Sequence, residues 1–141
     1  MNKQVFVDTS AWIMLINKSE QHHCEAVNIY SMLQQVKLVT SSYVLSETYT
    51  WLRKRNNFKS AFSFLQSIWR KAELNQLDLI YADPVLEKQA GLLLEKYAEH
   101  EISYADAVSF AIMKSMGIKA AFAYDKHFST AGFSIVDQTS I

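Results

Sequence analysis

The sequence Val5-Phe6-Val7-Asp8-Thr9-Ser10 places three apolar residues directly before a carboxylate. A short apolar run rich in β-branched residues predicts a strand that is buried on both faces, as the strands of a parallel sheet are. Thr9 and Ser10 then open a short helix over residues 11–16. This arrangement puts Asp8 immediately after a buried strand, which is a position where α/β proteins commonly carry functional groups.

The rest of the chain alternates in the same way between short apolar runs and segments with helical spacing. Further strands are expected at residues 38–40, 77–81, 120–124 and, at an edge, 133–136. Further helices are expected at residues 20–36, 41–55, 58–74, 84–97 and 103–117. Asp83-Pro84 is a strong helix start, because a capping carboxylate precedes Pro at the first helical position. The alternation predicts an α/β fold whose central, mainly parallel sheet of four to five strands has helices on both faces.

Length and composition exclude several classes of protein. The chain has 141 residues, half of them hydrophobic, which predicts a single compact domain over residues 1–141. Fourteen Lys and Arg balance fourteen Asp and Glu, which argues against a disordered chain and against a uniformly basic nucleic-acid binder. No apolar run approaches the roughly 20 residues of a membrane span. The chain reaches Asp8 too soon for a signal peptide and Cys24 has no partner, so we expect a cytoplasmic protein.

Four carboxylates have positions that point to a shared site. Asp8 and Asp125 directly follow expected strands, whereas Glu47 and Asp106 lie near the starts of helices that follow strands. Neither Glu47 nor Asp106 has a basic residue three or four positions away, and an unpaired carboxylate among apolar side chains is costly. Ligands of open α/β sheets bind beyond the carboxyl ends of the strands, and the topology can bring all four acids to that edge.

Each of these carboxylates also has an ordinary structural role open to it. Asp8 could cap the helix that follows its strand, and Asp106 completes a capping box with Ser103. Glu47 could be a partly exposed residue at the margin of an apolar stripe, and Asp125 could be a turn residue. The combination of the four acids, more than any one of them, therefore argues for a functional site.

Such a set of carboxylates predicts a hard metal ion. Clustered acids repel one another unless positive charge is supplied, and all-oxygen sets suit Mg²⁺ or Mn²⁺. A pair of such ions could activate a water for attack on a phosphodiester. Zinc is disfavoured, because Cys24 stands alone and His22-His23 are adjacent instead of being spaced along one helical face. The hydroxyls of Thr9 and Ser10 are candidates to orient Asp8 or to hold an outer-shell water.

Four segments in this order resemble the PIN-domain ribonucleases, and within them the VapC-type toxins of bacterial toxin–antitoxin pairs. They are Val5-Phe6-Val7-Asp8-Thr9-Ser10-Ala11-Trp12, Ser46-Glu47-Thr48, Ile102-Ser103-Tyr104-Ala105-Asp106-Ala107 and Ala123-Tyr124-Asp125-Lys126-His127-Phe128. The resemblance runs from about Lys3 to Val136 and implies a PIN-like, three-layer α/β/α fold. It implies that the metal ligands are Asp8, Glu47, Asp106 and Asp125, with Ser10 as a supporting hydroxyl. It further implies a Mg²⁺- or Mn²⁺-dependent endoribonuclease, a homodimer, and a small antitoxin that blocks the site.

Other functions stay open on the sequence. One is a nuclease of the same fold that processes RNA, or cuts DNA, without an antitoxin, and another is a catalytically silent RNA- or protein-binding module. A phosphatase of the haloacid dehalogenase type is disfavoured, because it needs a second Asp where this chain has Ser10. The chain has no Walker A loop, no G-x-G-x-x-G and no nucleophile elbow, so no nucleotide cofactor is expected.

The charge pattern indicates where RNA would bind. Residues 53–71 contain six basic residues and no acidic one, and we expect phosphate contacts from Arg53, Lys54, Arg55 and also Lys126. The aromatic residues interleaved with them favour a packed core. His127 either contacts a phosphate or the leaving group, or is a surface-loop histidine. Once the four acids are assigned to a metal pocket, the 14 basic residues face only ten acidic ones, which describes a negative pocket in a mildly basic body.

Overall fold

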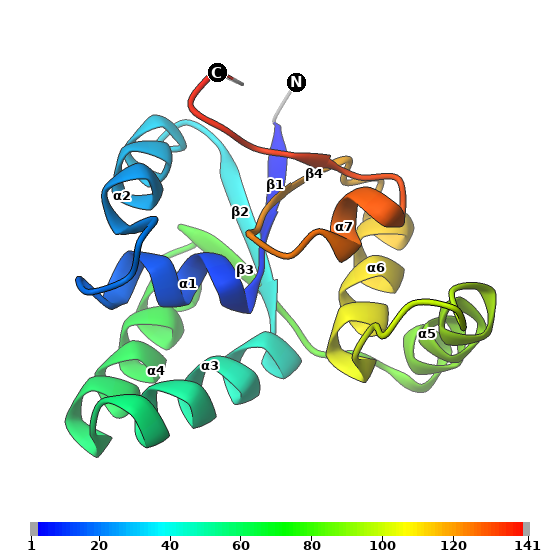
Figure 1. Cartoon of the computed structure of the whole chain (residues 1–141), viewed down its shortest axis with the longest axis horizontal. Coiled ribbons are helices and arrows are strands. Elements are labelled where there is room, and N and C mark those ends of the chain that lie inside the picture. The colour runs from blue at the N-terminus through cyan, green and yellow to red at the C-terminus, as the bar shows by residue number, and fades with distance from the viewer. Residues whose placement is uncertain (1–2, 140–141) are drawn as a thin grey trace.

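The computed structural model describes residues 3–139, which form a five-stranded parallel sheet with helices on both faces (Figure 1). The strands are β1 (Gln4–Val7), β2 (Lys37–Ser41), β3 (Leu77–Ile80), β4 (Ala120–Phe122) and β5 (Ser134–Ile135). Their order is β3-β2-β1-β4-β5, and each neighbouring pair is parallel. β1 is therefore the central strand. Its Phe6 and Val7 are fully buried, as the apolar run around them predicted.

The helices form a layer on each side of this sheet. They are α1 (Thr9–Ile16), α2 (His23–Met32), α3 (Ser42–Arg55), α4 (Phe58–Glu73), α5 (Pro84–Lys96), α6 (Tyr104–Met116) and α7 (His127–Thr130). In Figure 1, α1 to α4 lie to the left of the sheet and α5 to α7 to its right. The three-layer arrangement expected from the alternating sequence is thus confirmed. Within residues 3–139, no helix has both the length and the apolar character needed to cross a bilayer.

Side-chain caps fix where most of the long helices begin. Asp8 caps α1, Ser41 caps α3, and Asp83 with Pro84 opens α5. Ser103 opens α6 with a complete capping box. Because α1 follows β1 after Asp8 alone and α3 follows β2 directly, the N-termini of both helices stand at the carboxyl edge of the sheet. The partial positive charge of helix N-termini is therefore concentrated where the acidic residues lie.

α6 carries Asp106 into the interior of the protein. Residues 105–113 of this helix are all buried, and the helix contacts α3, α5 and α7. Phe110 packs edge-to-face against Phe128 of α7, with ring centroids 4.9 Å apart. The first turn of α6 is thus held rigidly, and Asp106 is only 7% exposed.

The expectation of a core position for the aromatic residues of α4 is only half right. Phe64 is buried against Trp12, but Phe58 and Trp69 are 52% and 41% exposed. α4 covers the core with one face only, formed by Ala61, Phe64 and Ile68. Phe58, Phe62 and Trp69 lie off that stripe and pack on one another at the surface.

Candidate metal centre

The ends of the central strands bring the predicted acidic residues together. Asp8 directly follows β1, and its backbone N–H donates to the carbonyl of Phe122 at the end of β4, at 3.0 Å. Asp125 lies in the loop after β4, and Asp106 approaches from the first turn of α6. Glu47 stands in α3, which begins where β2 ends. Residues that are far apart in the sequence therefore share one edge of the sheet.

Burial and mutual repulsion make Asp8, Glu47 and Asp106 resist ionisation. Burial raises the pKa of Asp8 to about 6, and burial together with the charges of Asp125 and Asp8 raises that of Asp106 to about 7. Partial burial also raises the pKa of Glu47, and Asp125 adds to this effect. Asp125 thus acts on each of the other three acids. Such a group is stabilised by positive charge from outside the protein, as a metal site requires.

Two adjacent hydroxyls hold the carboxylates in place. Ser10 Oγ donates to Asp8 Oδ2 at 2.8 Å and accepts from the backbone N–H of Tyr124 at 2.8 Å. Thr9 Oγ1 donates to Glu47 Oε1 at 3.1 Å. Ser10 therefore ties the end of β1 to the loop after β4, while Thr9 ties it to α3. These are the contacts that a supporting hydroxyl at a metal site makes.

The capping roles foreseen for two of the acids are present and are compatible with metal binding. Asp8 accepts a hydrogen bond from the Ser10 N–H at 3.3 Å as the N-cap of α1. Asp106 Oδ2 accepts from the Ser103 N–H at 3.4 Å, and Ser103 Oγ accepts from the Asp106 N–H at 3.0 Å. Capping fixes the orientation of each carboxylate toward the shared edge.

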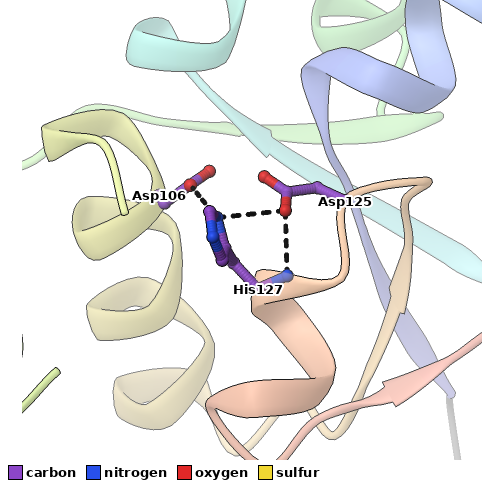
Figure 2. Close-up of side chains that lie close together, drawn as sticks. All are labelled: Asp106, Asp125 and His127. Carbon is purple, nitrogen blue, oxygen red and sulfur yellow. Dashed lines mark hydrogen bonds and ion pairs between the residues drawn. The ribbon is translucent and has the colours of Figure 1, made fainter. Parts of the chain in front are cut away.

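His127 lies between two of the carboxylates (Figure 2). Its Nδ1 is 3.3 Å from Asp106 Oδ2 and 3.1 Å from Asp125 Oδ1. The residue is the first of α7, with its side chain 20% exposed, so the surface-loop interpretation is wrong. A helix of a single turn leaves no periodic signal in the sequence, which is why this placement was missed. One ligand atom from each of Asp106, Asp125 and His127 lies within 4.8 Å of the others, which is compact enough for an ion.

A basic groove leads away from the acidic edge along α3. Its volume is about 490 Å³, and its lining residues are Thr9, Ser46, Glu47, Thr50, Trp51, Lys54 and Arg55. The Arg55 guanidinium lies over the Trp51 ring, 5.3 Å from its centroid. Two of the predicted phosphate contacts, Lys54 and Arg55, thus line the same groove as Glu47. Arg53 is exposed but does not line the groove, and Lys126 is exposed just before α7, next to His127.

Comparison with known proteins identifies the family. The model of the family described as the PIN domain matches residues 5–134, so the chain belongs to the PIN domain family. It is 37% identical over 129 residues to a protein of Mycobacterium tuberculosis named 23S rRNA-specific endonuclease VapC20. The aligned region covers 92% of this chain and 95% of the relative.

Solved structures agree with this assignment. The crystal structure of Mycobacterium tuberculosis VapC20, described as a sarcin-ricin loop cleaving toxin, has a TM-score of 0.84 and 34% identity, covering 94% of this chain and 98% of that one. The DNA-bound VapBC structure from Salmonella typhimurium has a TM-score of 0.67 and 16% identity, covering 98% and 99% of the two chains. The second similarity shows the fold alone. The resemblance inferred from the four sequence segments is confirmed at the level of family and fold.

Proposed function

We propose that this chain is a metal-dependent endoribonuclease that hydrolyses RNA phosphodiester bonds, with residues 1–141 working as one nuclease domain. The observation that carries the proposal is the convergence of Asp8, Asp106 and Asp125 at one edge of the sheet, beside a groove lined by Lys54 and Arg55. A negative centre next to a basic groove suits a phosphodiester strand that meets a divalent cation. The printed activity of the 37% identical relative supports RNA as the substrate.

The proposed cofactor is Mg²⁺ or Mn²⁺, held by Asp8, Glu47, Asp106 and Asp125. The donor set fits such an ion, since it is dominated by carboxylates whose pKa values are raised and for which no Lys or Arg partner is found within residues 3–139. A bound divalent ion would polarise the phosphate and supply a nucleophilic water at neutral pH. We include Glu47 among the ligands because Thr9, next to Asp8, donates a hydrogen bond to its carboxylate, and both residues line the groove.

The other residues position these ligands and the substrate. The Ser10 hydroxyl holds the carboxylate of Asp8, and the Ser103 backbone N–H holds that of Asp106. His127 Nδ1 contacts both Asp106 and Asp125 in the free protein, and we propose that it turns to the phosphate or the leaving oxygen when the cation binds.

Basic side chains around the centre complete the proposed RNA interface. Lys54 and Arg55 would neutralise phosphates in the groove, and Lys126 and Arg53 are exposed cations outside its lining. This division leaves the acids to bind metal and the bases to bind substrate.

The decisive experiment makes the same substitution, Asp to Asn, inside and outside the acidic cluster. Asp8→Asn and Asp106→Asn should abolish Mn²⁺-dependent cleavage of RNA by the purified protein. Asp83→Asn, which alters an N-cap carboxylate outside the acidic cluster, should leave cleavage intact. Retained metal-dependent cleavage in Asp8→Asn would show that the acidic edge is not the catalytic centre.

We propose further that the chain is the toxin of a toxin–antitoxin pair, forms a homodimer in the cytoplasm, and is blocked by a small antitoxin. The support is similarity to structures described as VapBC and as a toxin–antitoxin complex. Ribosomal RNA is the first substrate to test, because the relative is named for 23S rRNA. Induction of the wild type should arrest growth and cut ribosomal RNA, whereas induction of Asp106→Asn should do neither. Growth arrest by both proteins would contradict the nuclease-toxin proposal.

A further inference from the structure

Two tyrosines near the acidic edge share a single carboxylate. Tyr43, in the first turn of α3, and Tyr104, the first residue of α6, both donate a hydrogen bond to Oε1 of Glu87 in α5, the latter at 2.8 Å. Their ring centroids are 5.7 Å apart, with the planes tilted by 57°. The bond to Glu87 raises the pKa of Tyr43 to about 12, and the two tyrosines lower that of Glu87. Both hydroxyls therefore keep their protons, and the hydrogen bonds fix the orientation of the rings.

Helix geometry places Tyr43, and through it the tyrosine pair, beside the proposed ligand Glu47. Tyr104 lies in the same turn of α6 as Asp106, but side chains two positions apart do not face each other, so its link to the site is its ring contact with Tyr43. Tyr43 comes four residues before Glu47, so these two side chains share a face of α3. The same face of α3 continues to Lys54 in the groove. The strip from Tyr43 to Lys54 is roughly 16 Å long, at 1.5 Å per residue. Along α3 the strip therefore presents an aromatic, an acidic and a basic part in that order.

We propose that Tyr43 and Tyr104 form a binding site for a nucleobase next to the cleaved phosphodiester, and that the RNA strand follows α3 from this pair to Lys54. The inference rests on the proposed endoribonuclease function. Tyr104 is 43% exposed, so a face of its ring is open to a base. Aromatic rings bind unpaired bases by stacking, largely without regard to sequence.

Glu87 acts in this site as a positioning residue. A single carboxylate oxygen accepts from both hydroxyls, which orders two side chains before the substrate arrives. Preordering of this kind reduces the entropy that is lost when a ligand binds. The two hydrogen bonds also explain why a half-buried acidic residue is tolerated close to the proposed path of a negatively charged strand, since its carboxylate accepts from both tyrosine hydroxyls.

The test uses an oligoribonucleotide that the wild type cleaves, with 2-aminopurine placed in turn at each position around the cut. When the inactive Asp8→Asn variant binds this RNA, the fluorescence of 2-aminopurine should be quenched at a position next to the bond that the wild type cleaves. Adding Tyr104→Ala should remove that quenching. In the otherwise wild-type protein, Tyr104→Ala should raise KM roughly tenfold, within the range for loss of one base stack, with a smaller effect on kcat.

Two further variants separate stacking from helix packing. Tyr104→Phe keeps the ring and should retain most of the quenching. Glu87→Gln should have a KM between that of the wild type and that of Tyr104→Ala. Trp69→Ala is the matched control, because Trp69 is 41% exposed on α4 and packs against Phe62. It should leave KM unchanged.

The outcomes that overturn the inference differ from those that overturn the nuclease function. Cleavage by the wild type together with an unchanged KM and unchanged quenching in Tyr104→Ala would overturn the base site and leave the nuclease intact. Equal losses of thermal stability and of affinity in Tyr104→Phe and Tyr104→Ala would assign the cluster to packing of α3, α5 and α6. If the wild type cleaves no RNA with any divalent metal, the proposed function itself fails.

Discussion

Asp8 is only 4% exposed, so its ionised carboxylate is destabilising whenever no cation is bound. We predict that Asp8→Asn stabilises the metal-free protein at pH 8, because Asn retains the N-cap while removing the charge. The rise of the Asp8 pKa from 3.8 to about 6 corresponds to an upper value of about 3 kcal/mol. Denaturant unfolding in the presence of EDTA measures this gain. A variant less stable than the wild type under those conditions would contradict it.

The side chain of Ser10 joins Asp8, at the end of β1, to the loop that carries Asp125. We predict that Ser10→Ala lowers the free energy of unfolding by about 1–2 kcal/mol, since it leaves the Tyr124 N–H without its partner. Mn²⁺ affinity should fall as well, and calorimetric titration measures it independently of catalysis. Ser19→Ala, at an exposed serine, serves as the control and should change neither quantity.

The positions of the individual acidic residues, and their roles as helix caps, were predictable because each leaves a local signal in the sequence. A carboxylate after an apolar run, or three residues after Ser103, is visible in the sequence itself. His127 was not placed correctly, since its position depends on α7 packing Phe128 against Phe110, which is a contact between distant segments. The tyrosine clamp on Glu87 was missed for the same reason, because it joins residues from three helices.

At the scale of elements, the capping box of α6 connects folding with the metal centre. We predict that Ser103→Ala costs about 1 kcal/mol of stability, as the loss of an N-cap hydroxyl does. It should also weaken Mn²⁺ binding, because Asp106 loses the turn that holds its carboxylate. Calorimetric titration with Mn²⁺ and thermal unfolding measure the two effects. Ser103→Thr should preserve both properties, and a Thr variant as impaired as the Ala variant would argue against a capping role.

Element boundaries were accurate where the chain carries a start or stop residue. Asp83 and Ser103 are the N-caps of α5 and α6, which begin at Pro84 and Tyr104, and α6 ends before Gly117, which adopts a left-handed conformation with φ 69°. α2 is shorter than the expected helix over residues 20–36, because its N-cap His22 makes no capping hydrogen bond and the polar residues around it carry no boundary signal. Tertiary contacts, not local propensity, set its limits.

For the whole molecule, the raised pKa values predict a dependence of stability on pH. The folded, metal-free protein holds protons on Asp8 and Asp106 that the unfolded chain releases near pH 4. The stabilisation is therefore complete below pH 4 and is lost as the pH rises through about 6 and 7. We predict a melting temperature in EDTA that falls between pH 5 and pH 8. The fall should be smaller with saturating Mn²⁺ and in Asp106→Asn, and an equal fall in all three would contradict the assignment.

The balance of charge over the whole molecule predicts how RNA binding responds to salt. Replacing both Lys54 and Arg55 by Gln should reduce the slope of log affinity against log salt concentration by about 1.4, or about 0.7 for each phosphate contact on a single strand. Filter binding at several salt concentrations measures this slope. Lys18→Gln with Lys119→Gln, at exposed positions outside the groove, should leave the slope unchanged.

The order of the strands has a consequence for how the protein is made. The central strand β1 is synthesised before its neighbour β4 and before Asp125, and β2, β3 and the helices α1 to α6 are made in between. Until about residue 125 has been synthesised, the acidic edge lacks the residue that influences all the other carboxylates. A nascent chain is therefore without a complete centre while it is being translated. With this strand order, the proposed nuclease centre is completed only after β4 and Asp125 have been made.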